Sequence, residues 1–152
     1  MRARGVSHRQ AECPVARTVD VIGDRWSLLI VRDAFDGIRR FSELQRNLGL
    51  AKNILAARLR ELVAQGILEV VPAADGSAYH EYVLTAKGRE LFSVIVALRK
   101  WGEMYLFEEG EPHSTLLDTE SELPVGLQVT NAAGHPISAA DAFVRKVPAS
   151  SA

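Results

Sequence analysis

The side chains best placed to do chemistry in this chain are the basic ones between residues 39 and 60. That window holds six Lys and Arg residues against one acid, although the whole chain has a net charge of −1. The six bases are Arg39, Arg40, Arg46, Lys52, Arg58 and Arg60. A local excess of positive charge is typical of proteins that bind nucleic-acid phosphates, and it matters more than the total charge. A solvated helix face gives the same pattern, so charge alone leaves both interpretations open.

Cys13 is the single cysteine of the sequence, and it lies where a thiol could react. Pro14 suits the first position of a helix, which makes Cys13 the N-cap. The positive end of that helix and Arg17 favour a thiolate, whereas Glu12 opposes it. Oxidation would then link two subunits or form a mixed disulfide or an adduct. The alternative is a small apolar residue buried where two subunits meet.

No group of residues has the spacing of a catalytic or metal site. The four histidines lack ligand spacing, and the sequence has no Gly-rich phosphate loop, nucleophile elbow or Cys/His pair. We therefore expect no enzyme activity, no cofactor and no metal. The basic residues 1–10 are not followed by an apolar stretch, and no apolar run approaches the roughly 18 residues of a membrane span. With one cysteine, these features predict a cytoplasmic protein without a membrane segment.

The basic window falls on two short predicted helices around a glycine turn. Ser42 and Gln45 form a capping box that predicts the start of the first helix. Gly49 interrupts the pattern, and a second helix is expected from about Lys52 to Gln65. The residues expected to face inward are Leu44, Leu48, Leu55, Leu59 and Leu62. Two helices joined in this way make a helix-turn-helix pattern.

A β-hairpin and a long helix are predicted after this pair. Residues 68–71 and 81–84 have the composition of strands, joined through an Asp75-Gly76 turn. Thr85 caps a helix predicted over 86–108, whose apolar side is too large for one small domain to cover. A symmetric partner would bury the excess. Two further helices are expected upstream, over about 14–22 and 26–35.

The expected fold is mainly α with a small β-hairpin, a winged helix-turn-helix. Residues 1–11 form an N-terminal arm, 12–109 the helix-turn-helix domain, and 110–152 an extension rich in Pro, Gly, Ser, Thr and Ala. We expect weak β structure in the extension, over 127–130 and 143–147, packed on the body.

Six stretches of the sequence carry a resemblance to a known family. They are Cys13-Pro14-Val15, Ile22-Gly23-Asp24-Arg25-Trp26, Arg40-Phe41-Ser42-Glu43-Leu44, Leu55-Ala56-Ala57-Arg58-Leu59-Arg60-Glu61-Leu62, Gly66-Ile67, and Glu81-Tyr82-Val83-Leu84-Thr85-Ala86-Lys87-Gly88. In this order and spacing, over about residues 12–108, the chain resembles the HxlR-type winged helix-turn-helix regulators, relatives of the MarR family.

The resemblance implies a DNA-binding transcription regulator, with repression as the expected mode. It implies a homodimer formed by the helices around 14–22 and 86–108, and some members sense oxidants or electrophiles at the position of Cys13. A two-fold dimer predicts a pseudo-palindromic operator with half-sites about 10 base pairs apart. A small-molecule effector is the other expected signal. The alternative is a winged-helix module that binds protein and not DNA.

Three positions depart from the family pattern. Ala51 stands where a Ser usually caps the second helix, so that cap should be weak. Thr130 and Ala133 stand where some members have cysteines, so any metal site there should be lost.

The predicted DNA contacts follow from the helical rotation and the wing. With the leucines inward, Asn53, Ala57 and Arg60 point outward and Lys52 and Arg58 lie on the flanks. The full set expected to contact DNA is Arg39, Arg40, Ser42, Lys52, Asn53, Ala57, Arg58, Arg60 and His80. The wing tip has no Lys or Arg, which predicts a weak contribution from the wing. Aromatic side chains expected to line an effector pocket are Trp26, Phe92, Trp101, Tyr105 and Phe107, although aromatics at helical spacing are usually core.

Overall fold

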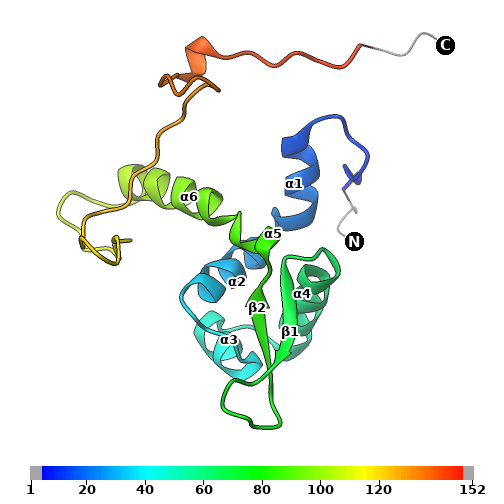
Figure 1. Cartoon of the computed structure of the whole chain (residues 1–152). Coiled ribbons are helices and arrows are strands. Elements are labelled where there is room, and N and C mark those ends of the chain that lie inside the picture. The colour runs from blue at the N-terminus through cyan, green and yellow to red at the C-terminus, as the bar shows by residue number, and fades with distance from the viewer. Residues whose placement is uncertain (1–4, 149–152) are drawn as a thin grey trace. The chain divides into compact units, whose positions relative to one another are not determined.

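A computed structural model describes residues 5–148 of the chain (Figure 1). The elements in chain order are α1 (Pro14–Ile22), α2 (Arg25–Phe35), α3 (Phe41–Leu48), α4 (Lys52–Ala64), β1 (Leu68–Pro72), β2 (His80–Leu84), α5 (Ala86–Arg89), α6 (Phe92–Tyr105) and a 3₁₀ turn at Ala139–Asp141. The chain divides into two compact units, one up to Ile95 and one from Val96 onward. The prediction of a mainly helical fold with a small hairpin is confirmed. Residues 1–4 of the predicted arm and 149–152 of the predicted extension lie outside the described residues.

The start of α2 shows how local sequence sets a helix boundary. Asp24 is the N-cap, and its carboxylate accepts hydrogen bonds from the backbone N–H groups of Trp26 at 3.1 Å and Ser27 at 3.0 Å. Farther along α2, the fully buried Asp33 accepts a bond of 2.8 Å from the Asn47 side-chain amide. This pair joins α2 to α3, because a buried carboxylate needs donors that replace water.

The hydrophobic core of the first unit packs against one side of the helix-turn-helix. Leu55, Leu59 and Leu62 of α4 are almost completely buried, as the predicted stripe requires, and Leu44 of α3 is buried beside them. The other buried members of this core are Ile22, Ile30, Val31, Leu50, Ile67, Leu68 and Leu84. Because this core lies within residues 22–84, the first unit has its own apolar interior without any residue of the extension.

The hairpin lies beside α4 and forms the wing (Figure 1). β1 and β2 are antiparallel, in a register that pairs Leu68 with Leu84 and Pro72 with His80. On the other edge of β2, the Tyr82 N–H donates to the carbonyl of Arg39 at 2.8 Å. The segment before α3 is therefore tied to the wing by a backbone hydrogen bond.

The prediction of one helix over 86–108 is wrong in two respects: the helix is interrupted after Arg89, and it ends at Tyr105. Thr85 does cap the start, because its hydroxyl accepts from the Gly88 N–H at 3.0 Å. The helix stops at Arg89, and a tighter turn, in which the Leu91 N–H donates to the Gly88 carbonyl, leads into α6. Glycine is a poor helix former, and at Gly88 it is needed, since a Cβ there would lie 2.1 Å from the Ile67 carbonyl oxygen. Within residues 5–148, no helix combines the length and apolarity needed to cross a membrane.

The predicted capping box at Ser42 is also wrong. The N-cap of α3 is Arg40, and no side chain caps this helix. Ser42 therefore lies two residues too late, at the second helical position, where its hydroxyl cannot serve as the cap.

The extension contains turns rather than the strands predicted over 127–130 and 143–147. Its β structure within the described residues consists of two isolated bridges, Leu117 with Pro124 and Thr130 with Pro136. The Asn131 side chain accepts from the backbone N–H groups of Ala133 and His135, both at 3.0 Å. These bonds close the turn at 131–135 beside the bridge between Thr130 and Pro136, and Pro136 has no N–H that could extend the pairing into a ladder.

Candidate DNA-binding surface

The turn between α3 and α4 fixes how α4 is presented. Gly49 ends α3 with a φ of 66°, a left-handed conformation that glycine adopts without strain. Leu50 is buried, and its carbonyl accepts from the Gln45 side-chain amide at 3.2 Å. Because these contacts hold both sides of the turn, the start of α4 is set at a defined angle to α3.

The first turn of α4 offers polar side chains that nothing else in the described structure engages. Lys52 and Asn53 are exposed, and neither forms a hydrogen bond or ion pair with another described residue. Arg60 is also exposed, and its Nε makes a bond of 3.5 Å to the Ala56 carbonyl on its own helix. Ala57 is half-buried rather than fully outward. The free donors and acceptors therefore gather at the N-terminal end of α4.

Arg58 differs from Lys52 because it has an acidic partner. Its guanidinium lies 3.6 Å from the Asp24 carboxylate, the cap of α2. Burial raises the pKa of Asp24, but hydrogen bonds from Ser27 and Trp26 together with the Arg58 charge outweigh it and leave the pKa below its usual value. Asp24 is therefore ionised at neutral pH, and Arg58 connects α4 to the start of α2.

The two arginines before α3 are both paired with acids of the wing. Arg39 lies 3.7 Å from Glu81 of β2, and Arg40 forms an ion pair with Asp75 in the turn between the strands. Hydrogen bonds from Ser77 and Arg40 lower the pKa of Asp75 to about 2, and the same carboxylate raises the pKa of Arg40. Both contacts reduce the positive charge that these arginines present to DNA.

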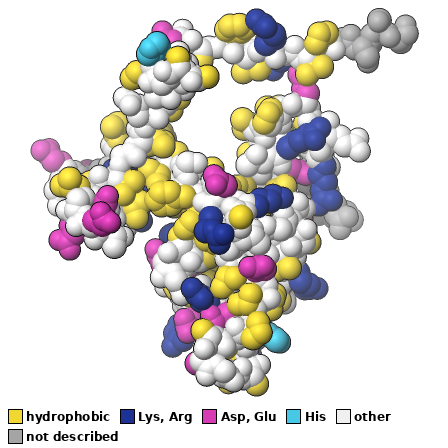
Figure 2. Space-filling view, in the orientation of Figure 1, with side chains coloured by type: hydrophobic (Ala, Val, Ile, Leu, Met, Phe, Trp, Pro, Cys, Tyr) yellow, Lys and Arg dark blue, Asp and Glu magenta, His cyan; other side chains and the backbone are white. Residues whose placement is uncertain are grey.

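The remaining predicted contacts are exposed but show no special geometry. Ser42 lies in the first turn of α3, and His80 begins β2 opposite Pro72. Figure 2 shows Lys and Arg side chains interspersed with Asp and Glu on the visible face, and no large patch of one sign. Within the window, three of the six bases, Arg39, Arg40 and Arg58, are paired with acids.

Arg46 is a residue that the sequence reasoning counted but did not select. It is exposed in the last turn of α3, and no described side chain pairs with it. With Lys52 and Arg60 it is one of the three bases of the window without an acidic partner among residues 5–148. The signal available in the sequence was its position one turn before Gly49, close to the start of α4.

Cys13 occupies the N-cap of α1 as expected and is exposed. The Arg17 guanidinium donates to the carbonyl of Ala11, on the segment that leads into the helix. The thiol is therefore accessible in the single chain, and the expectation of a sensing role stays a prediction.

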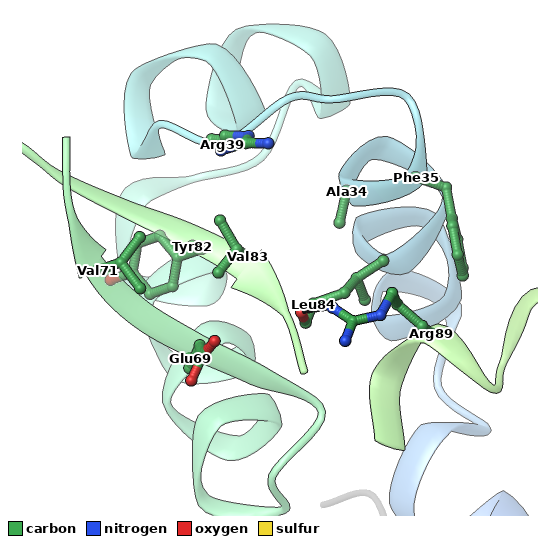
Figure 3. A pocket seen from close by; sticks show the side chains of 9 residues that line it. All are labelled: Ala34, Phe35, Arg39, Glu69, Val71, Tyr82, Val83, Leu84 and Arg89. Carbon is green, nitrogen blue, oxygen red and sulfur yellow. Dashed lines mark hydrogen bonds between the residues drawn. The ribbon is translucent and has the colours of Figure 1, made fainter. Parts of the chain in front are cut away.

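The five aromatic residues expected to line an effector pocket make separate ring contacts. Phe92 packs against Phe35 with ring centroids 5.6 Å apart, and Trp101 packs against Tyr105 at 5.4 Å. A cavity of about 450 Å³ instead lies between α2 and the hairpin, with Arg39 and Arg89 from different elements at its edge (Figure 3). A second, of about 260 Å³, lies against α1. None of the five aromatics lines either cavity, so a pocket built from them stays a prediction.

An α-helical pair with a glycine turn, followed by an antiparallel hairpin packed beside the second helix, defines a winged helix-turn-helix protein. The match to a family model sharpens this class. The chain belongs to the HxlR-like helix-turn-helix family, whose model matches residues 21–110.

Known proteins similar to this chain are regulators of transcription. An HTH-type transcriptional regulator of Mycobacterium tuberculosis is 46% identical over 113 residues, which cover 74% of this chain and 72% of the relative. The crystal structure of PA1607, described as a candidate transcription factor, has a TM-score of 0.86 and 56% identity and covers 93% of this chain and 100% of that chain. The redox regulator HypR in its reduced form has a TM-score of 0.55 and 34% identity, covering 60% of this chain and 92% of that chain. The chain is a DNA-binding regulator of the helix-turn-helix class and not an enzyme.

Proposed function

We propose that this protein is a sequence-specific repressor that reads a pseudo-palindromic operator as a homodimer in the cytoplasm. The observation that carries the proposal is the first turn of α4, where Lys52 and Asn53 are exposed and have no partner among residues 5–148. In a helix-turn-helix this turn reaches base edges in the major groove. Asn pairs with adenine through two hydrogen bonds, and Lys binds guanine or phosphate. Arg46 and Arg60, which have no acidic partner in the described structure, supply further positive charge for the DNA backbone.

Exposed apolar side chains support the homodimer. On α1, Val15 and Val19 are 70% and 57% exposed, although they share a face of the helix. On α6, Trp101 and Tyr105 are 59% and 64% exposed. Apolar groups that stay in water lose the stabilisation of about 25 cal/mol per Å² that burial gives, so a second copy covering both helices is favoured. A two-fold axis then places the α4 helices in half-sites about 10 base pairs apart.

The signal that releases DNA acts at Cys13 or through a small ligand. Cys13 is exposed and begins one of the two helices proposed to form the dimer, so modification of its thiol would alter subunit packing. The similarity to the redox regulator HypR supports the thiol route. The ligand route rests on the apolar and aromatic side chains near the proposed dimer helices.

A gel-shift titration tests the proposal and separates the two signals. The DNA comes from upstream of the protein's own gene and then from a selection on genomic fragments. The protein is reduced in one series and treated with diamide in the other. Specific binding that is lost with diamide in the native protein but kept in Cys13→Ser supports thiol control, whereas binding indifferent to diamide assigns the signal to a ligand. Failure to select any fragment contradicts the proposal of sequence-specific DNA binding and favours the alternative of a winged-helix module that binds protein.

The ion pairs within the protein decide which charge reversal on α4 is the cleaner test of DNA contact. Arg58→Glu would place a second carboxylate beside Asp24 and disturb the start of α2, so a loss of binding would have two causes. Lys52→Glu reverses a charge that no described residue engages. We expect this variant to lose operator binding while keeping the melting temperature of the native protein.

A further inference from the structure

The wing places acidic side chains, and no Lys or Arg, beside the arginines that precede α3. Glu81 is buried, accepts a bond of 2.9 Å from the Ala74 N–H, and lies beside Arg39. Asp75 lies in the turn of the hairpin and pairs with Arg40, the residue at the N-cap position of α3. The segment between the strands, residues 73–79, contains no Lys or Arg. The wing therefore neutralises charge at the approach to α3 instead of adding to it.

The contact between Asp75 and Arg40 is held from several sides. One Asp75 oxygen accepts from the Ser77 N–H at 2.9 Å, which orients the carboxylate, while the other oxygen bonds to the Arg40 guanidinium. The Tyr79 ring lies 5.3 Å from the same guanidinium, within the range of a cation–π contact. Arg40 thus has a fixed place between the start of α3 and the tip of the wing.

A DNA phosphate and Asp75 compete for the same guanidinium. Arg40 precedes α3, where helix-turn-helix proteins contact the DNA backbone, and backbone contacts carry no sequence information. Each phosphate neutralised by a side chain adds about 0.9 to the slope of log affinity against log salt, for any sequence. An acidic side chain that pairs with Arg40 therefore lowers the affinity for DNA of any sequence. Base contacts from α4 then contribute a larger share of the remaining affinity.

We propose that Asp75 is a positioning residue for specificity, which occupies Arg40 and thereby suppresses binding to DNA of arbitrary sequence. The inference rests on the proposed DNA-binding function and adds a determinant that lies in the wing. Specific binding then depends on base contacts from α4, above all from Asn53, whose side chain has no such competitor among the described residues.

The test compares Asp75→Asn with Glu90→Gln on a duplex of random sequence. Asn keeps the acceptor for the Ser77 N–H, so the turn is preserved while the charge is removed. Glu90 is exposed, lies at the end of α5 and has no described partner, which makes it a matched neutralisation elsewhere in the same unit. Fluorescence anisotropy from 50 to 300 mM salt gives affinity and slope. For Asp75→Asn we expect affinity for the random duplex about fivefold to tenfold higher near 0.1 M salt, and a slope steeper by about 0.9.

A double-mutant cycle with Arg40→Gln shows whether Asp75 acts through Arg40. The effect of Asp75→Asn should disappear in the Arg40→Gln background, and a wing that had merely lost its structure would weaken binding in both backgrounds. No change beyond that of Glu90→Gln, or weaker binding by Asp75→Asn, overturns the inference. Failure of the native protein to select any genomic fragment contradicts the proposed function itself, whereas an Asp75→Asn variant that binds the operator but gains no affinity for the random duplex at 50 mM salt overturns only this inference, so the two failures are distinguishable.

Discussion

The polar side chains at the start of α4 and the arginines before α3 come from one stretch of sequence, but their surroundings differ. Lys52 and Asn53 face solvent without a partner in the described part of the chain, whereas Arg39 and Arg40 are paired with Glu81 and Asp75 of the wing. The positive charge counted along a sequence is therefore larger than the positive charge a fold offers to DNA. In this molecule the difference directs DNA recognition toward α4 and away from the wing.

The largest expected effect is loss of base contact from the first turn of α4. Asn53→Ala should weaken operator binding by about 10- to 100-fold, the equivalent of roughly 1–3 kcal/mol for a bidentate pair with adenine. Discrimination at the contacted base should relax in the same variant, as measured by gel shift on single-base operator variants. Gln128→Ala, an exposed amide in the extension, is the control and should leave binding unchanged. Equal binding by Asn53→Ala and native protein would show that Asn53 does not contact a base of the operator.

A pair of alanine substitutions compares a free base with a paired one on the same helix. Lys52→Ala should reduce the salt slope by about 1 and weaken binding to all sequences. Arg58→Ala should change DNA binding less, and lower the free energy of unfolding by up to about 1 kcal/mol because its partly exposed ion pair with Asp24 is lost. Anisotropy and urea unfolding measure the two quantities. If Arg58→Ala loses as much affinity as Lys52→Ala, an ion pair within the protein does not prevent DNA contact.

The uncapped start of α4 gives a smaller, stabilising prediction. Ala51 is the N-cap, its backbone is extended, and no side chain accepts from the free N–H groups of the first turn. Ala51→Ser supplies a hydroxyl acceptor and should raise the free energy of unfolding by about 1 kcal/mol. Urea unfolding measures the gain relative to the native protein. A serine variant no more stable than the native protein would show that α4 gains nothing from a side-chain cap.

The smallest expected effect is on the stability of the fold at low pH. The pKa of Asp24 is lower in the folded chain than in the unfolded one, so its ionised form stabilises the fold. This contribution is complete above the unfolded value near 3.9 and is lost as the pH falls through the lower folded value. Asp24→Asn keeps a capping oxygen and should therefore lose less stability than the native protein between pH 5 and pH 3. Urea unfolding at the two pH values measures the difference, and identical losses would mean that other carboxylates dominate.

The parts of the molecule fixed by neighbouring residues could be predicted from the sequence. The Asp24 cap, the leucine stripe of α4 and the Gly49 turn each depend on contacts within a few residues. The pairing of Arg40 with Asp75 joins residues 35 apart, and no local pattern reveals it. The break after Arg89 likewise comes from the approach of Gly88 to Ile67, which only the folded chain shows. Short apolar segments in the extension were compatible with strands, but within the described residues they form only isolated bridges, because a strand needs a pairing partner that local composition does not reveal.

The close approach at Gly88 has a consequence for genetics. A methyl group at this position would collide with the Ile67 carbonyl and force α5 away from the hairpin, at a cost of about 1–3 kcal/mol. A domain of marginal stability that loses this amount remains folded in the cold and unfolds a few degrees earlier on warming. A strain carrying Gly88→Ala would then regulate normally at low temperature and lose regulation when warmed. Codon 88 is thus a natural place to obtain a temperature-sensitive allele of this regulator.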